Sequence, residues 1–412
     1  MFSKKTKDKE EYLKMEINND VGDIIDYTSE LILLAMELQA SDVHIEPLKS
    51  FVSIRFRESG DFIYIEKISH DEYTKLLSRI KIMANLRIDE KNRPQDGKIG
   101  FKAEKTGELV DIRVSILPII DGEKIVMRIL RQDSSLLNVD KLEFLDLNLS
   151  KTKETLKSQY GMILVAGPTG SGKSTTLFSI LNHFNPLEYN ISTLEDPVEY
   201  NIPYINQTQV RPEMGFDFAN GLRSLVRQDP DIIMVGEIRD KETASLAIEA
   251  ALTGHLVLST IHTNSAASTI QRLINMGIEP YLIVSALKLI ISQRLVKKIC
   301  PYCKKQYRIT EEVLSNKIDG YLKGIIPEKA KDIDFYEAIG CEKCGNTGYK
   351  GRIGIQEILV LNEELDSLIL NKASVHEIEE KAKKLGMITI MQDGIIKAAT
   401  EKTTIQEVMK LI

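Results

Sequence analysis

The sequence contains no stretch of about 18 uncharged apolar residues, so a transmembrane helix is not expected. Neither sign of charge dominates its 412 residues, with 54 lysines and arginines against 60 aspartates and glutamates. This balance excludes a global basic field of the kind that wraps nucleic acid. The sequence also shows no basic stripe with interleaved aromatic residues, so direct nucleic-acid handling is not predicted. The charged first residues have no apolar run behind them. A signal peptide is therefore not expected, and the protein is expected to stay in the cytosol.

Cysteine is scarce, with four residues in two pairs. In a reducing compartment, paired cysteines favour metal ligation over disulfides. Hydrophobic residues make up 43% of the chain and charged residues 28%, which is the ordinary balance of a globular protein and excludes wholesale disorder. At about 150 residues per domain, the length predicts two or three domains.

The first part of the chain predicts a small α+β domain. Residues 1–20 are mixed in charge and are expected to form a flexible N-terminal segment. Residues 21–132 are expected to form the domain, and polar residues with scattered leucines at 133–150 predict a linker. The predicted elements are helices at 21–39 and around 76–83, and strands at 51–57, 62–65, 109–116 and 124–130.

Residues 151–412 show a different pattern. Short apolar runs, such as Met162–Ala166, Ile232–Val235 and Leu256–Ser259, alternate with helical segments. Continuous apolar strands between helices predict a largely parallel sheet that is covered on both faces, and hence an α/β domain. From residue 345 onward the pattern is mostly helical.

Residues 167–175 match the phosphate-binding pattern G-x-x-x-x-G-K-[ST] and add a second threonine. The motif follows an apolar strand and precedes a helical run, which is the context it requires. Its glycines let backbone N–H groups converge on phosphate oxygens at the positive end of the helix. Lys173 is expected to reach the β- and γ-phosphates, and Ser174 to bind Mg²⁺. The expected nucleotide-binding residues are Gly167, Pro168, Thr169, Gly170, Ser171, Gly172, Lys173, Ser174 and Thr175.

Two acidic clusters downstream are candidates for holding the metal and orienting water. Glu237 ends an apolar strand, and a carboxylate at the C-terminal edge of a parallel strand points toward the phosphate crevice. We therefore expect Glu237 near Mg²⁺, and Glu199 or Glu195 to polarise the attacking water. The alternatives are that Glu195 and Asp196 cap the following helix and that Glu237 is structural.

Two histidines, His255 and His262, bracket the apolar strand of Leu256–Ser259. By composition alone, each is more often a satisfied core histidine than a catalytic one. A neutral imidazole at a strand end can also sense the γ-phosphate through a hydrogen bond. The residues themselves leave both interpretations open.

The cysteines follow the pattern C-x₂-C…C-x₂-C. Each pair can form a turn that presents two thiolates, and four thiolates complete a closed tetrahedral Zn²⁺ site with no position for a substrate. The expected metal is therefore structural. Four reduced thiols without metal, or a redox C-x-x-C, are the alternatives. The expected zinc ligands are Cys300, Cys303, Cys341 and Cys344.

Several motifs together carry a family resemblance. The phosphate loop and the segments Leu194–Tyr200, Asp229–Asp240 and Thr253–Thr263 resemble the Walker A, Asp box, Walker B and His box of secretion ATPases. Over about residues 25–412, the chain is similar to the ATPases of type II secretion and type IV pilus assembly. The four cysteines also fit this family, as do Ser41–Pro47, Arg93–Gly97, Gly122–Leu130 and Thr403–Val408.

The resemblance implies a PAS-like N-terminal domain followed by a RecA-like ATPase domain, with a zinc-binding insert at 300–344 and helices at the C-terminus. Subunits of the family form a homo-hexameric ring and bind ATP and Mg²⁺ between the domains. By this resemblance, Arg113 and Arg128 are arginine fingers that stabilise charge on the transferred phosphoryl group. Arg55 and Arg57 are weaker candidates. The implied catalytic residues are Glu195, Glu199, Glu237, Arg113, Arg128 and His262, and His255 and Glu237 are added to the nucleotide-binding set.

The function implied is that of a cytoplasmic motor that hydrolyses ATP to drive assembly of pilin or pseudopilin subunits. Its expected partner is a polytopic platform protein of the inner membrane, which would place it peripherally at the cytoplasmic face. Retraction motors generally lack the tetracysteine site, which favours assembly over retraction. Longer assembly ATPases carry a further N-terminal domain, which is not expected here because the chain begins close to the small domain. A scaffold that binds ATP with negligible turnover is the alternative from another class.

Overall fold

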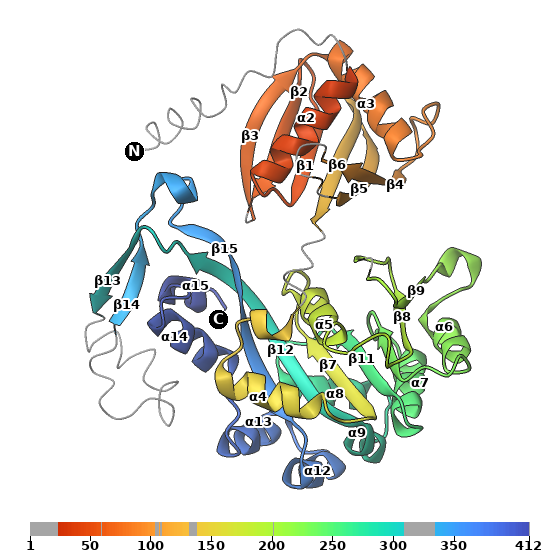
Figure 1. The fold of residues 1–412 in the computed structure, drawn as a ribbon, viewed down its shortest axis with the longest axis vertical. Coiled ribbons are helices and arrows are strands. Elements are labelled where there is room, and N and C mark those ends of the chain that lie inside the picture. The colour runs from red at the N-terminus through yellow and green to blue at the C-terminus, as the bar shows by residue number, and fades with distance from the viewer. Residues whose placement is uncertain are drawn as a thin grey trace. The chain divides into compact units, whose positions relative to one another are not determined.

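The computed structural model describes residues 24–58, 60–103, 107, 109–131, 138–200, 202–308 and 334–411. The chain divides into two compact units, Met1–Gln132 and Asp133–Ile412 (Figure 1). The flexible segment expected at 1–20 lies outside the described residues. Each unit has its own hydrophobic core.

The small unit is an antiparallel sheet with two helices on one face. Its elements are α2 (Ile24–Glu37), β1 (Asp42–Pro47), β2 (Val52–Glu58), β3 (Asp61–Ile68), α3 (His70–Met83), β4 (Gln95–Lys102), β5 (Leu109–Ile119) and β6 (Gly122–Arg131). The strand order is β3-β2-β1-β6-β5-β4. Figure 1 shows α2 and α3 lying side by side across the sheet.

Buried apolar and more exposed charged residues alternate along the strands, and this alternation explains which face of the sheet the helices cover. In β5, Ile112 and Val114 are buried whereas Arg113 between them is half-buried. The apolar residues pack with Leu31 of α2 and Leu76 of α3 in one core. Since successive strand residues point to opposite faces, the charged residues gather on the face that the helices leave uncovered.

The large unit is built on a seven-stranded sheet. Its strands are β7 (Gly161–Ala166), β8 (Ile191–Glu195), β9 (Asn206–Gln209), β10 (Ile232–Val235), β11 (Leu256–Ile261), β12 (Leu287–Ile299) and β15 (Tyr349–Val360). Their order is β15-β12-β7-β11-β10-β8-β9, and all neighbours are parallel except β12 and β15. This architecture confirms the predicted mixed α/β class with a largely parallel sheet.

Helices cover both faces of this sheet. The helices are α4 (Asp146–Thr155), α5 (Lys173–Leu181), α6 (Phe218–Leu225), α7 (Lys241–Leu252), α8 (Ala266–Asn275), α9 (Pro280–Ala286), α12 (Glu363–Leu370), α13 (Val375–Lys384), α14 (Ile390–Ala399) and α15 (Ile405–Met409). Met162 and Leu164 of β7 pack in the core shared with α7, α8 and α9, whereas Ile163 and Val165 pack in the core shared with α5. All six residues of β7 are therefore buried.

Two segments differ from the sequence-based expectation. Residues 349–360 form β15, which pairs along most of its length with β12, so the helical pattern expected from residue 345 begins only at α12. Of the segment expected to be a linker, residues 138–150 contain the short helix η2 (Val139–Lys141) and the start of α4. Val139 and Phe144 are buried in the core of the large unit, so this part of the segment belongs to that unit.

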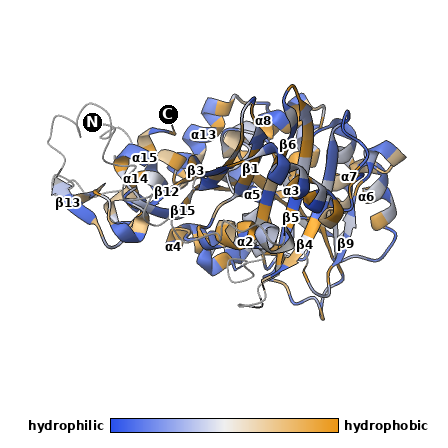
Figure 2. Cartoon of the chain, turned by 90° about the horizontal axis from the view of Figure 1, so that it is seen from above, coloured by the Kyte–Doolittle hydropathy of each residue, from blue (hydrophilic) through white to orange (hydrophobic). Residues whose placement is uncertain are grey.

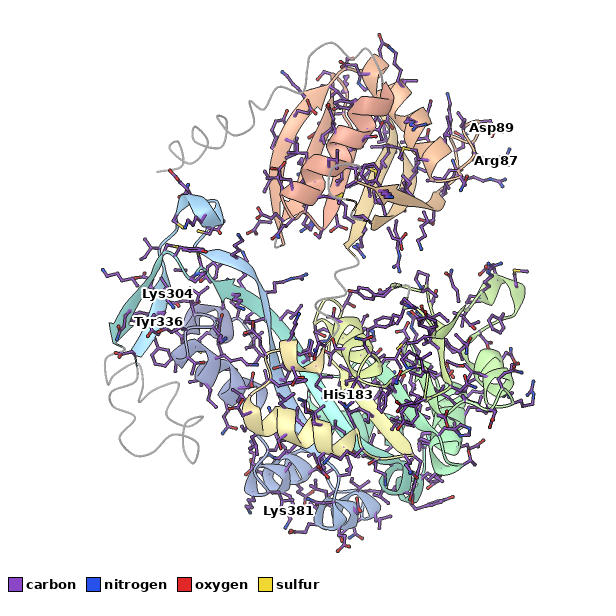
Figure 3. The ribbon with its side chains drawn as sticks, in the orientation of Figure 1. Arg87, Asp89, His183, Lys304, Tyr336 and Lys381 are labelled. Carbon is purple, nitrogen blue, oxygen red and sulfur yellow. The ribbon has the colours of Figure 1, made fainter. Side chains whose placement is uncertain are left out.

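The cysteines lie on a small projecting substructure between β12 and β15. It contains an antiparallel pair, β13 (Lys304–Arg308) and β14 (Asp334–Ala338), and the short helix η6 (Glu342–Cys344). The ammonium of Lys304 lies 5.6 Å from the ring centroid of Tyr336 on the neighbouring strand (Figure 3). Part of the expected insert, residues 309–333, lies outside the described residues.

Among the described residues, no helix combines the length and the apolar character that crossing a bilayer requires. Figure 2 shows hydrophilic and hydrophobic residues mixed along the helices, α6 and α7 among them. This mixing is the pattern of helices that bury one face against a core.

Candidate nucleotide site and cysteine cluster

The phosphate loop connects β7 to α5, as its sequence predicts. Gly167, Gly170 and Gly172 have φ values of 153°, 78° and 83°, a region that L side chains rarely adopt. A Cβ on Gly167 would lie 2.6 Å from the backbone oxygen of Gln293, and one on Gly172 would lie 2.8 Å from the side-chain nitrogen of the same residue. Conformation thus favours glycine at all three positions, and lack of space adds to this at Gly167 and Gly172 but not at Gly170, where a Cβ would meet no atom within 4 Å.

Lys173 begins α5 and folds back over the loop. Its Nζ donates hydrogen bonds to the carbonyl oxygens of Gly167 and Pro168, each at 3.0 Å. Burial lowers the pKa of Lys173, while the carboxylates of Glu237 and Glu199 oppose that shift. The structure therefore places both acids within electrostatic range of the loop lysine.

Ser174 and Thr175 follow Lys173 in the first turn of α5 and are half-buried, whereas Pro168, Thr169 and Gly170 are exposed at the tip of the loop. Ser171 is buried. The residues of the motif thus form one continuous turn at the carboxyl end of β7. That is the position at which open parallel sheets bind their ligands.

Glu237 lies just beyond the carboxyl end of β10. Its side chain, 14% exposed, forms an ion pair with Arg239, and its Oε2 lies 3.5 Å from Nε2 of His262. Burial and the positive charge of Lys173 lower the pKa of His262, although Glu237 opposes them. His262 is therefore neutral at pH 7 and faces the acid from the end of β11.

Glu195 and Glu199 occupy different environments. The carboxylate of Glu195 is buried and accepts hydrogen bonds from Thr193 Oγ1 at 2.6 Å and from Gln207 Nε2 at 2.9 Å. Burial raises the pKa of Glu195, against the lowering effect of these donors. Glu199 is half-buried and acts on the charge of Lys173. Of the two acids, Glu195 is therefore held in place by hydrogen bonds from side chains of β8 and β9.

His255 is not part of this group. It precedes β11, whose residue Leu256 pairs with Gly161 at the start of β7, and its Nδ1 lies 2.9 Å from the carbonyl oxygen of Ala250. The phosphate loop follows the other end of β7. A strand of six residues spans about 20 Å, so His255 lies at the opposite edge of the sheet from Lys173. Contrary to the expectation from sequence, the structure does not bring His255 to the nucleotide site.

Arg113 and Arg128 lie directly opposite each other on β5 and β6 of the small unit. Both occupy the face of the sheet that α2 and α3 leave uncovered. The Nε of Arg128 donates to Oδ1 of Asp42 at 2.8 Å, and the Arg128 side chain is 62% exposed. The structure thus brings the two expected arginine fingers together on one charged surface.

The four cysteines converge on a single point. Their Sγ atoms all lie within 4.8 Å of one another, and three of the separations are 3.9, 3.8 and 3.7 Å. A tetrahedral Zn²⁺ with Zn–S bonds of about 2.3 Å separates its sulfurs by about 3.8 Å, so the cluster fits this metal. The described residues thus support metal ligation over two separate redox pairs.

Backbone donors support the cluster. The N–H groups of Cys341 and Gly348 each donate to Sγ of Cys344 at 3.2 Å. Burial raises the pKa of Cys344, but these donors together with hydrogen bonds from the thiols of Cys341 and Cys303 lower it to about 6. A Cβ on Gly340 would lie 2.7 Å from the carbonyl oxygen of Asn346, so glycine is required at this turn.

Three polar residues around the phosphate loop carry no local sequence signal. Gln207 on β9 holds Glu195, and Gln293 on β12 contacts the phosphate loop. Arg294 donates to the carbonyl oxygen of Asn264 at 2.9 Å, which ties β12 to the segment after His262. Each role depends on strands that are distant in sequence. None of the three residues belongs to a nucleotide-binding motif.

This arrangement is the one found in nucleotide hydrolases. It combines the phosphate loop with Glu237 after β10, and with Glu195 and Glu199 at and after the adjoining strand β8. A protein-family model described as "Type II/IV secretion system protein" matches residues 18–410. The chain belongs to this family. It is an ATPase of the type II secretion and type IV pilus assembly class, as its motifs predict.

Named relatives agree with this placement. The chain is 43% identical over 418 aligned residues to the type IV pilus assembly ATPase PilB of Myxococcus xanthus, covering 96% of this chain and 73% of that protein. It is also 43% identical to PilB of Thermus thermophilus, of which it spans 45%, and 42% identical to the type II secretion system ATPase E of Vibrio cholerae, of which it spans 76%. Pilus and secretion ATPases are thus similar to the chain to the same degree.

Solved structures match the fold. The chain resembles the ATPase DotB of Legionella pneumophila with a TM-score of 0.67 and 22% identity, covering 93% of this chain and 95% of that one. It resembles the pilus retraction motor PilT with a TM-score of 0.64 and 26% identity, covering 93% of this chain and 96% of that one. These matches confirm an antiparallel N-terminal sheet followed by a mostly parallel ATPase sheet.

Proposed function

We propose that the large unit hydrolyses ATP with Mg²⁺ at the phosphate loop. Lys173 would exchange its bonds to two loop carbonyls for the β- and γ-phosphate oxygens, and Ser174 would ligate Mg²⁺. Mg²⁺ would neutralise charge on the phosphates. Glu237 would hold a water ligand of the metal, and Glu199 would orient the attacking water. His262, neutral beside Glu237, would respond to the γ-phosphate.

One observation carries this proposal: Glu237, Glu199 and His262 all gather around Lys173. They come from the ends of three different strands or the loops after them, and Lys173 begins the helix after a fourth. Phosphoryl transfer depends on positioning and on neutralising charge. Side chains this far apart in the sequence can serve it together because the fold brings them to one place.

Hydrolysis measured on the full chain tests the proposal. We expect phosphate release from ATP that requires Mg²⁺ and falls by at least about 10²-fold in Lys173→Ala. A scaffold that only binds ATP would show the same negligible release in wild type and variant. That result, obtained with assembled rings, would overturn the assignment.

Different roles are predicted for the two acids after β8. Because Glu199 acts toward Lys173, we expect Glu199→Gln to lower single-turnover hydrolysis by about 10²-fold and to leave thermal stability unchanged. In Glu195→Gln the amide oxygen can still accept from Thr193 and Gln207, but the N–H₂ group replaces the oxygen that accepts from the backbone N–H of Glu199 at 3.4 Å. We therefore expect a loss of about 1 kcal/mol of stability and a smaller effect on turnover. Denaturant unfolding and single-turnover assays on both variants decide, and the reverse pattern would contradict the assignment.

We further propose that Cys300, Cys303, Cys341 and Cys344 bind one structural Zn²⁺. The tetrahedral spacing of the sulfurs and the N–H donors at Cys344 support this. With four thiolate ligands, no coordination position is left for a substrate. The metal would therefore fix the substructure between β12 and β15 and take no part in hydrolysis.

We propose a homo-hexamer as the working form, in which Arg113 and Arg128 stabilise charge on the phosphates of ATP. The names of the relatives, a type IV pilus assembly ATPase and a type II secretion system ATPase, support a role in pilus assembly or type II secretion. Within that role, we propose that the chain drives assembly of pilin or pseudopilin subunits at the cytoplasmic face of the membrane, through a polytopic platform protein. Identification of the membrane protein that co-purifies with the chain would distinguish a pilus machine from a secretion machine. Recovery without any membrane protein of this kind would contradict the proposed partner.

A further inference from the structure

A line of buried polar side chains leads from the phosphate loop to α14. It begins at Gln293 on β12, which is 3% exposed. The Nε2 of Gln293 donates to the carbonyl oxygen of Ser171 at 2.7 Å, and its Oε1 accepts from Oγ1 of Thr176 at 2.7 Å. One amide thus holds the chain on both sides of Lys173.

Gln356 on β15 is the second member. It pairs directly with Gln293 across the two strands, so the two side chains lie on the same face of the sheet. Gly354 leaves room for both. A Cβ there would lie 2.1 Å from Nε2 of Gln356 and 3.7 Å from Cδ of Gln293. The two side chains are therefore neighbours in one buried layer, in which Nε2 of Gln356 donates to the carbonyl oxygen of Leu142 at 3.4 Å.

An ion pair on α14 completes the line. Nζ of Lys397 donates to Oε1 of Gln356 and, at 2.7 Å, to the carbonyl oxygen of Gly354. It also lies 2.8 Å from Oδ2 of Asp393, which accepts from the backbone N–H of Gln356 at 3.0 Å. Lys397 is 2% exposed and Asp393 is fully buried.

Such a group is poorly explained by stability alone. Burying two charges costs much of what their attraction returns, and apolar residues of similar size often stabilise a core as well or better. Buried polar networks instead fix one conformation of the groups beside them when their hydrogen bonds are made. In this group, as far as the described residues show, Oδ1 of Asp393 is the one buried side-chain atom without a hydrogen-bond partner. Here the residue next to the group, across the paired strands, is Gln293, which holds the phosphate loop.

We propose that Gln293 is a positioning residue of the phosphate loop, and that Gln356, Lys397 and Asp393 fix Gln293 in the orientation that serves ATP. The inference rests on the proposed binding of ATP at this loop. It makes α14, which carries no nucleotide motif, part of the machinery that shapes the site.

Binding of a fluorescent ATP analogue with Mg²⁺, and steady-state hydrolysis, test this on the full chain. Loss of the two hydrogen bonds in Gln293→Ala is expected to raise the dissociation constant and KM for ATP roughly tenfold, with a smaller change in kcat. Lys397→Met combined with Asp393→Asn removes the ion pair without leaving a lone buried charge. This double substitution is expected to raise the dissociation constant and the KM for ATP, each by about three- to fivefold.

The combination of all three substitutions gives the decisive readout. If the ion pair acts through Gln293, the triple variant binds ATP no more weakly than Gln293→Ala alone. Ile395→Ala is the matched control, because Ile395 is buried on α14 but packs with Phe335 of β14. It is expected to lower thermal stability and leave ATP affinity unchanged.

Three results would overturn the inference. These are wild-type affinity in the Gln293→Ala variant, additive effects in the triple variant, and equal loss of affinity in Ile395→Ala, which would mark the effect as general destabilisation. Absence of binding by the wild-type chain would instead refute the proposed nucleotide site, and the inference with it.

Discussion

Replacing Glu237 with glutamine is expected to lower single-turnover ATP hydrolysis by about 10²–10³-fold while ATP still binds. The substitution keeps the size of the side chain and removes its charge. In the structure that charge faces Lys173, pairs with Arg239 and lies near His262. Without it, nothing at the end of β10 would hold a water ligand of Mg²⁺, whereas the phosphate loop would still bind the nucleotide.

The matched control is Glu242→Gln. Glu242 lies in the first turn of α7, is 60% exposed and pairs with Arg223 of α6. The same chemical change there is expected to leave hydrolysis within about twofold of wild type, because exposed ion pairs contribute little. Quenched-flow measurements on both variants provide the comparison. Equal activity in Glu237→Gln and Glu242→Gln would contradict the role of Glu237.

Loss of the metal is expected to have the second large effect. Cys344→Ser removes the thiolate that accepts two backbone N–H donors, so we expect the zinc content to fall from one per chain to near zero. The free energy of unfolding should fall by at least ~3 kcal/mol, because a structural metal is bound only in the folded state. Elemental analysis and thermal unfolding measure the two effects.

The consequence should extend beyond the cysteines. Phe335 of β14 is buried among Ile395, Ala398 and Val408, so the substructure that carries the cysteines packs on α14 and α15. Hydrogen exchange in residues 334–338 and 390–399 is therefore expected to accelerate in Cys344→Ser. Tyr302→Ala, at an exposed residue of the first cysteine turn, is the control and should retain zinc. Retention of zinc by Cys344→Ser would contradict the proposed ligand set.

The nucleotide motifs could be placed from sequence because their roles are local. A buried apolar strand, a glycine-rich turn and a helix beginning at Lys173 follow one another along the chain, and each is encoded by its own residues. Glu237 could be placed for a similar reason, since it directly follows a buried strand. The cysteine pairs, too, carry their chemistry in their spacing.

His255 shows where local reasoning fails. His255 and His262 bracket the same strand and look equivalent in sequence. The direction of β11 separates them, because only its carboxyl end lies at the edge that carries the phosphate loop. Applying that rule to both ends of the strand would have separated the two histidines.

Non-local pairing accounts for the remaining differences. The sequence does not predict β15, because Lys350, Arg352, Gln356 and Glu357 interrupt its apolar residues. The segment shows neither a continuous apolar run nor a regular alternation, and its strand character depends on pairing with β12. Gln293 reaches the phosphate loop because Ser292 pairs with Ala166 at the end of β7. That register is set by the folded sheet, and the residues around Gln293 in the sequence do not predict it.

Calorimetric titration of the wild-type chain and Lys173→Ala with ATP and Mg²⁺ tests the central claim most directly. The predicted result is saturable heat from the wild type, with one site per chain or a regular fraction of a ring, and at least tenfold weaker binding by the variant. No heat from the wild type, or equal affinity of the two proteins, would contradict a nucleotide site at this loop.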